Sequence, residues 1–155
     1  MFPSGAATVY LAEEAVGLAA ALAAGAVDDG PVLLVKGTGT PGQAVVDAVA
    51  RLDPDRVVAL GSTGDLPDAT VSAVAGGLPT QRIDGYGPVE VAAGLAVAGW
   101  PDGADVVHLA DPDALADGLA GGVLLGGPIL LVPGEGPVPS VVVDAVRTLD
   151  PDRIV

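Results

Sequence analysis

Half of the 155 residues are apolar and only 17% are charged, a balance typical of a folded domain with one ordinary core, which excludes a disordered chain. Twenty acidic side chains against six basic ones give a net charge of −14, which repels phosphate and argues against nucleic acid or an anionic membrane as a direct partner. Cysteine is absent, so disulfides, thiolate catalysis and the usual zinc sites are excluded.

Membrane insertion is not expected either. No run approaches the roughly 18 consecutive apolar residues that span a bilayer, because Gly, Pro or Asp interrupts each one. Residues 1–5 lack a basic region followed by an apolar stretch, so we expect no export signal in this segment. Either the protein stays inside the cell or the segment is the mature part of an exported protein.

Short β-branched runs alternate along the chain with alanine-rich helical stretches. In chain order we predict a strand at 8–12, a helix at 14–26, a strand at 31–36, a helix at 42–51, a strand at 56–61, a helix at 67–75, a strand at 80–84 and a helix at 88–98. A turn follows near 100–103, and the apolar residues of 138–149 have the spacing of one buried helical face. This order predicts an α/β fold with a parallel sheet flanked by helices.

The chain contains an internal repeat. Residues 52–58, Leu-Asp-Pro-Asp-Arg-Val-Val, return almost unchanged 97 residues later at 149–155. The same offset aligns 30–35 with 127–132, and a slip of one residue aligns 9–12 with 107–110. We therefore predict a first repeat unit at 1–103 and a partial second one at 104–155, packed in the same or a neighbouring module. Because the second copy stops inside the unit, we expect a downstream portion or a neighbouring subunit to cover it.

Residues 37–42, Gly-Thr-Gly-Thr-Pro-Gly, form a literal G-x-G-x-x-G between a predicted strand and a predicted helix, the context of a dinucleotide-binding loop. The second copy reads Gly-Glu-Gly-Pro-Val-Pro at 134–139, so Pro139 replaces the third glycine and Glu135 stands where a phosphate would lie. We interpret the motif as a structural turn and keep a nucleotide-binding enzyme or sensor as the least favoured alternative.

Residues 61–64, Gly-Ser-Thr-Gly, follow a predicted strand and are able to present backbone N–H groups and two hydroxyls to an anion. The competing interpretation is a turn in which Asp65 caps the next helix and Pro67 lies in its first turn. We favour the turn.

No catalytic constellation emerges from the sequence. His108 is the only histidine, lies within a predicted strand and aligns with Tyr10 in the repeat, which favours a strand-face residue. No serine lies in a G-x-S-x-G motif, and no His–acid pair has metal-ligand spacing. We predict a protein that is not an enzyme, with no cofactor and no metal.

Several segments together resemble a known family. Residues 113–116, Asp-Ala-Leu-Ala, precede 127–132, Gly-Pro-Ile-Leu-Leu-Val; the strand at 56–60 with its glycine loop precedes 82–85, Arg-Ile-Asp-Gly, and then Ala92-Ala93. In that cyclic order they resemble the cell wall-binding repeat of type 2, which reads as a DAL helix start, a PILL strand, a GG loop and an RISG…R…TA segment. The resemblance covers nearly the whole chain. The first copy departs from it at 13–16, Glu-Glu-Ala-Val, and at Pro88-Val89 near the second Arg.

The resemblance implies a Rossmann-like or flavodoxin-like module of tandem βαβ units, commonly three in tandem or in a trimer. Such modules tether exported proteins non-catalytically to anionic wall polymers of Gram-positive bacteria. It therefore implies an extracellular, cell wall-associated protein whose partner is a cell-wall polysaccharide or teichoic-type polymer, and a homo-oligomer, with a trimer favoured. A structural, self-assembling module without polymer binding is the alternative.

Six basic residues are available for contact with such a polymer. Arg82, in the RISG-like segment, is the preferred candidate, and Lys36, Arg56 and Arg153 are the weaker ones. The other two, Arg51 and Arg147, lie near the ends of matching predicted helices, where the helix dipole explains them without a ligand.

Overall fold

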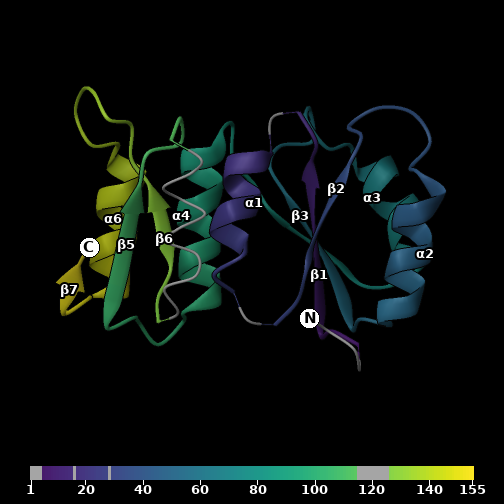
Figure 1. The fold of residues 1–155 in the computed structure, drawn as a ribbon, viewed down its shortest axis with the longest axis horizontal. Helices are drawn as coiled ribbons and strands as arrows, with labels where there is room; N and C mark the ends of the chain where they lie inside the picture. Colours follow the sequence, from purple (N-terminus) through teal and green to yellow (C-terminus); the bar gives the residue numbers. More distant parts are fainter. Residues whose placement is uncertain (1–4, 16, 28, 115–125) are drawn as a thin grey trace.

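The computed structural model describes residues 5–15, 17–27, 29–114 and 126–155. It confirms the α/β fold with parallel sheets flanked by helices (Figure 1). The first part of the chain forms β1 (Thr8–Glu13), α1 (Leu18–Ala24), β2 (Val32–Val35), α2 (Gln43–Leu52), β3 (Arg56–Leu60), α3 (Asp68–Ala75), β4 (Thr80–Ile83) and α4 (Pro88–Gly99). The later part forms β5 (Val106–Ala110), β6 (Ile129–Leu131), α6 (Ser140–Leu149) and β7 (Arg153–Ile154).

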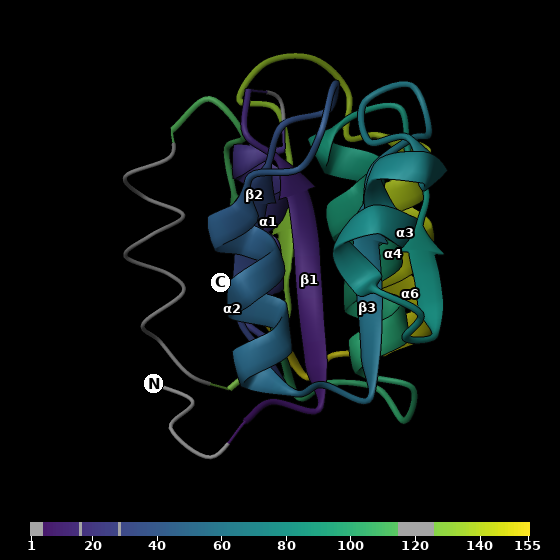
Figure 2. The same ribbon diagram turned by 90° about the vertical axis from the view of Figure 1, so that its right-hand side faces the viewer.

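The strands form two separate parallel sheets. The first has the order β2-β1-β3-β4 and the second the order β6-β5-β7. In β1 the side chains alternate between two cores, because successive residues of a strand point to opposite faces. Val9 and Leu11 pack toward α2 and α3, whereas Tyr10 and Ala12 pack toward α1 and α4. Figure 2 looks onto α2 and α3, which lie in front of the first sheet.

The repeat is reproduced in backbone detail. The helices α2 and α6 both end on an aspartate in the left-handed region, Asp53 with φ 46° and Asp150 with φ 44°. In each case the N–H of that aspartate donates to the carbonyl four residues earlier, in Val49 and in Val146. Left-handed aspartate is tolerated more readily than most side chains, so the two copies stop their helices by the same device.

Two further glycines mark the repeat. A Cβ on Gly30 would overlap the carbonyl oxygen of Thr8, and a Cβ on Gly127 would overlap that of Val106. Both glycines let the segment before an edge strand pass directly against the first residue of the central strand. This close approach requires glycine in both copies.

The second sheet packs against the first unit through α4. Ile129 and Leu131 of β6 belong to the same buried core as α1 and α4, while Leu130 belongs to a core with α6. In Figure 1, α1 and α4 accordingly lie between the two sheets. Trp100 caps the end of α4 and packs, half-buried, on the core of the second sheet.

The main difference from the sequence-based expectation lies before α1. This helix begins at Leu18 rather than near 14, because Glu14 and Ala15 form a turn directly after β1. The N–H of Ala15 donates to the carboxylate of Glu13 at 2.7 Å, and the N–H of Gly17 donates to the carbonyl of Glu13 at 2.9 Å. The family-like segment at 113–116 lies partly outside the described residues, at 115 and 116. Within the described part of the chain, every helix is too short or too polar to cross a membrane.

Candidate functional site

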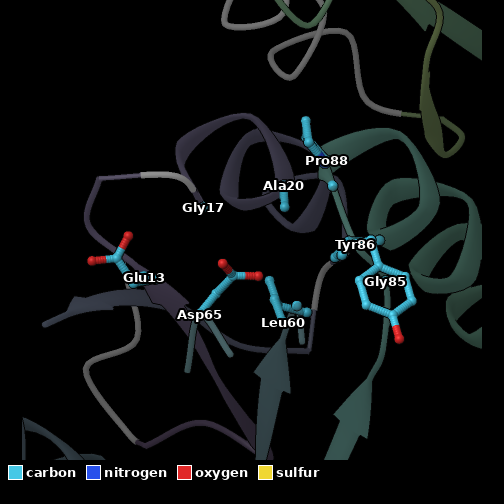
Figure 3. A pocket seen from close by; sticks show the side chains of 11 residues that line it. Glu13, Gly17, Ala20, Leu60, Asp65, Gly85, Tyr86 and Pro88 are labelled. Atoms are coloured by element: carbon cyan, nitrogen blue, oxygen red, sulfur yellow. The ribbon is translucent and has the colours of Figure 1, made fainter. Parts of the chain in front are cut away.

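A crevice opens at the carboxyl ends of β1 and β3. From β1 the chain passes to β2 on one side, whereas from β3 it passes to β4 on the other, so the loops that leave these neighbouring strands diverge. In open parallel sheets this switch point is where ligands usually bind. The cavity here has a volume of about 180 Å³ (Figure 3), and its described lining residues include Glu13, Leu60, Asp65, Tyr86 and Val91.

Glycines shape the walls of this crevice. Gly61 follows β3 with φ 102°, a conformation that L side chains rarely adopt. A Cβ on Gly85 would lie 2.9 Å from Cβ of Glu90 and 2.9 Å from Cγ2 of Val91, so the loop before α4 needs glycine to pass this helix. Four of the described lining residues, Gly17, Gly61, Gly85 and Gly87, therefore contribute backbone alone to the wall of the crevice.

Two carboxylates line the crevice, that of Glu13 from the end of β1 and that of Asp65 from the loop after β3 (Figure 3). The hydroxyl of Ser62 donates to Oδ2 of Asp65 at 2.7 Å, and the N–H of Asp65 donates back to Oγ of Ser62 at 3.3 Å. The prediction that Asp65 caps the following helix is wrong. The cap residue of α3 is Pro67, which leaves Asp65 too far back along the chain to reach the free N–H groups of the helix.

Tyr86 forms the outer edge of the crevice. Its N–H donates to Oε2 of Glu90 at 2.8 Å, which fixes the backbone, while the residue remains 92% exposed. Of the described residues that line the crevice, none is basic. Carboxylates and carbonyl oxygens accept hydrogen bonds from hydroxyl groups but repel phosphate.

The two glycine-rich turns have packing roles. A Cβ on Gly37 would overlap the carbonyl oxygen of Asp65 and lie 3.0 Å from Cγ of Glu13, so this glycine lets one turn pack on another. Gly42 is the cap residue of α2, and a Cβ at this position would meet nothing within 4 Å. Ser62, in the second turn, uses its hydroxyl on Asp65.

Arg82, the preferred polymer contact, is held by its own unit. Its side chain is 16% exposed, and its guanidinium donates to the carbonyls of Gly61 and Leu66 and to Oδ1 of Asp68, each at 2.7 Å. The fork of Arg82 thus links β4 to the loop after β3 and to the first turn of α3. Sequence reasoning could not find this role, because the acceptors lie 14 to 21 residues earlier in the chain, in the loop after β3 and at the start of α3.

Arg56 belongs to a polar cluster that the sequence analysis missed. Asp29 accepts hydrogen bonds from the hydroxyls of Thr8 at 2.7 Å and Tyr10 at 2.8 Å, and forms an ion pair with Arg56 at 3.2 Å. Burial and the neighbouring Asp29 carboxylate raise the pKa of Tyr10 well above that of a free tyrosine, so its hydroxyl remains a donor. The available signal was a pair of polar residues, Thr8 and Tyr10, on one face of an otherwise apolar strand.

The four predicted polymer contacts do not converge on one site. Lys36 is exposed just beyond the carboxyl end of β2, whereas Arg56 is at the amino end of β3, the opposite edge of the same parallel sheet. Arg153 is exposed at the start of β7 in the second sheet.

His108 lies within β5, as predicted, and its backbone N–H donates to the carbonyl of Pro128 at 2.9 Å. Within the described residues, no group of three or more acidic or histidine side chains is arranged to hold a metal ion.

The fold resembles two solved structures. The first, Cwp6 from Clostridium difficile, superposes with a TM-score of 0.72 and 18% sequence identity over 96% of this chain and 24% of that protein. The second, Cwp8 from Clostridium difficile, superposes with a TM-score of 0.74 and 16% identity over 94% of this chain and 26% of that protein. The chain thus spans about a quarter of each, and identities this low establish the shared fold alone. No family model matches the chain, and no curated protein matches it.

Proposed function

We propose that this chain is a non-catalytic cell-surface module that tethers an exported protein to an anionic polymer of the cell wall. The observation that carries the proposal is the fold likeness to the cell wall proteins Cwp6 and Cwp8 over almost the entire chain. The resemblance of its repeat to the cell wall-binding repeat of type 2 supports the same function. On this proposal the protein lies outside the cell and is associated with the wall.

The polymer contacts proposed for this module are Lys36, Arg56, Arg153 and Arg82. The first three are exposed, so their charges are accessible to a ligand. Arg82 is occupied by three acceptors of its own unit and is the weakest of the four on geometric grounds. On a surface with a net charge of −14, binding to a polyanion depends on such local positive charge.

The test is pelleting with purified Gram-positive cell walls. We expect the chain to be enriched in the pellet over an unrelated acidic protein of equal net charge. Replacing Arg56 with Gln should lower the bound fraction several-fold, whereas Arg147→Gln removes the same charge from an exposed helix and should leave it unchanged. Equal pelleting of the chain and the acidic protein would overturn the proposal.

A second candidate function is structural self-association, and an exposed apolar surface supports it. Leu109 and Ile154 form an exposed apolar strip on one face of β5 and β7, and no described element covers it. The neighbouring Val155 is exposed as well. Burying such a surface is worth about 25 cal/mol per Å² before the entropic cost of association. We propose a homo-oligomer, with a trimer as the favoured form, in which the partial second unit at 104–155 packs on a neighbouring chain.

Light scattering at micromolar concentration tests this candidate. The expected result is a mass larger than that of one chain, reduced by Ile154→Asp, which places a charge in the apolar strip. A monomer that remains monomeric as concentration rises would exclude self-association without affecting the wall-binding proposal.

A further inference from the structure

A second cavity opens at the opposite edge of the first sheet from the crevice. It lies at the amino ends of the strands, between the sheet and the end of α4, which is the lower edge of the sheet in Figure 1. Its volume of about 580 Å³ falls within the roughly 300–1,000 Å³ of small-molecule sites. Val58, Ile83 and Leu95 supply apolar lining from the sheet and from α4.

Hydrogen-bond donors converge on this cavity. The Nη2 group of Arg56 donates to Asp29 at 3.2 Å, and the Tyr10 hydroxyl also interacts with this guanidinium. These two partners do not use all five N–H donors of an arginine, so part of the fork is left for a ligand. The side-chain amide of Gln81 also lines the cavity, and it forms no hydrogen bond within the described part of the chain. A guanidinium with free N–H groups is suited to a carboxylate or phosphate, because its fork matches the spacing of two oxygens.

Acceptors are present on the other wall. The last carbonyl groups of a helix have no partner within it, and Ala98 and Gly99, in the final turn of α4, line the cavity. A ligand that spans the cavity therefore meets donors on the sheet side and acceptors on the helix side. An apolar lining between them suits the C–H face of a sugar ring.

The fold itself does not require the polar cluster beneath Arg56. Thr8 is fully buried and Tyr10 nearly so, and an apolar core of the same shape is often as stable as a satisfied polar one. The second copy shows this directly, because Val106, His108 and Gly126 stand where the first has Thr8, Tyr10 and Asp29. Both copies share the left-handed aspartate after the helix and the glycine that passes against the central strand. Among the described residues, the polar cluster of Thr8, Tyr10 and Asp29 occurs only in the first copy, which also has the cavity.

We propose that this cavity binds a sugar unit carrying a carboxylate or phosphate group. Arg56, held in place by Asp29, Thr8 and Tyr10, clamps the anionic group; Gln81 and the end of α4 bind hydroxyls; and the apolar lining contacts the ring. The choice of a sugar, rather than another small anion, rests on the proposed wall-binding function.

The experiment is a titration of the full chain followed by the amide and side-chain signals of ¹H–¹⁵N spectra. The probes are glucose 1-phosphate and glucuronate. Glucose, which lacks the anionic group, and inorganic phosphate, which lacks the sugar, are the control ligands. We expect saturable shifts at Arg56, Gln81, Ala98 and Gly99 with both anionic sugars, and at least tenfold weaker binding of glucose and of phosphate. The relative affinity of the two sugars identifies the anionic group.

Variants test the assigned residues. Arg56→Lys keeps the charge but loses the fork, and should weaken binding at least tenfold, whereas Arg147→Lys, on the exposed face of α6, should not change it. Should Arg56→Lys alter the fold, Gln81→Leu, at an exposed position of β4, tests the same cavity and should weaken binding several-fold.

Three results would overturn this inference: no binding of either sugar, shifts confined to another surface, or phosphate binding as tightly as the sugar phosphate. Each is distinguishable from failure of the proposed function. If the chain pellets with walls but shows any of the three, the cavity assignment fails alone. If the sugars bind at the cavity but walls are not pelleted, the tethering function fails and the cavity assignment stands.

Discussion

Leu11 of the first sheet is completely buried, whereas Leu109, its counterpart in the second sheet, exposes 42% of its surface. The opposite holds one strand away, where Leu34 of β2 is 43% exposed and its counterpart Leu131 of β6 is only 2% exposed. The strands pair alike in both copies, so the strand itself does not explain the difference.

The neighbouring elements explain it. Leu11 lies in a core completed by α3, and no described element occupies that place over β5. Leu131 instead lies against α1 and α4, whereas no described element covers Leu34 of β2. Equivalent residues of the two copies thus contribute differently to the stability of the protein, because different helices pack against them.

The largest expected effect comes from the glycines that both copies share. Gly30→Ala should lower the free energy of unfolding by about 4 kcal/mol or more, because the Cβ overlaps the backbone of Thr8, the first residue of the central strand β1. Gly127→Ala creates the same overlap in the second sheet, and we expect it to expose β5–β7 amides to hydrogen exchange while the first sheet remains protected.

Gly42→Ala is the matched control, since its Cβ meets nothing within 4 Å. Denaturant unfolding measures the first effect and hydrogen exchange the second. Equal loss of protection in both sheets with Gly127→Ala would show that the two copies unfold as a single unit.

Next in size are the paired leucines. Leu11→Ala should cost about 2–5 kcal/mol, as is usual for a buried leucine, whereas Leu109→Ala should cost less than about 1 kcal/mol. Denaturant unfolding of the two variants measures the difference. Similar losses of stability in the two variants would mean that another molecule covers β5 in solution, for example in an oligomer. In that case dilution should dissociate the oligomer and restore the difference in unfolding free energy between Leu11→Ala and Leu109→Ala.

Arg82→Ala should lower stability by about 2–3 kcal/mol, because it removes charged donors from the carbonyls of Gly61 and Leu66. This side chain supports the loop and helix that have no described counterpart in the second copy. Arg147→Ala removes only an exposed ion pair with Asp144 and should have almost no effect. If wall binding falls in Arg82→Ala without loss of stability, Arg82 contacts the polymer instead.

The smallest effect is expected from Tyr10, which His108 replaces in the second copy. A folded-state pKa raised above the unfolded value of about 10 gives stability that is complete below that pH and is lost as pH rises above it. Unfolding measured from neutral to strongly alkaline pH should show this loss in the parent but not in Tyr10→Phe. In Tyr86→Phe, where Tyr10 is the only tyrosine left, phenolate absorbance should appear at a higher pH than in free tyrosine.

Most of the fold could be predicted from the sequence. The internal repeat and the alternation of β-branched and alanine-rich runs placed each described strand and helix, since both signals depend only on local pattern and on burial of one face. The start of α1 was the exception, because a carboxylate of Glu13 holding the N–H of Ala15 replaces the first predicted turns of helix.

The candidate sites could be predicted only in part. The basic residues were identified by type, but their roles depend on partners far apart in the chain. Arg56 meets Asp29, 27 residues away, and Arg82 meets Gly61, 21 residues away. No rule of residue spacing predicts that residues separated by these numbers of positions in the sequence will be in contact. Comparison of the two copies offers a partial remedy, because a polar residue that the repeat does not keep, such as Thr8, is a candidate for a role beyond folding.

The position of Trp100 makes its fluorescence a probe of the contact between α4 and the second sheet. As the only tryptophan of the chain, it lies where the end of α4 meets the core of the second sheet. Undocking of the second sheet would bring this indole into water and shift its emission to longer wavelength. Tryptophan fluorescence therefore reports on the junction between the two units, independently of the circular dichroism signal of the helices around the first sheet.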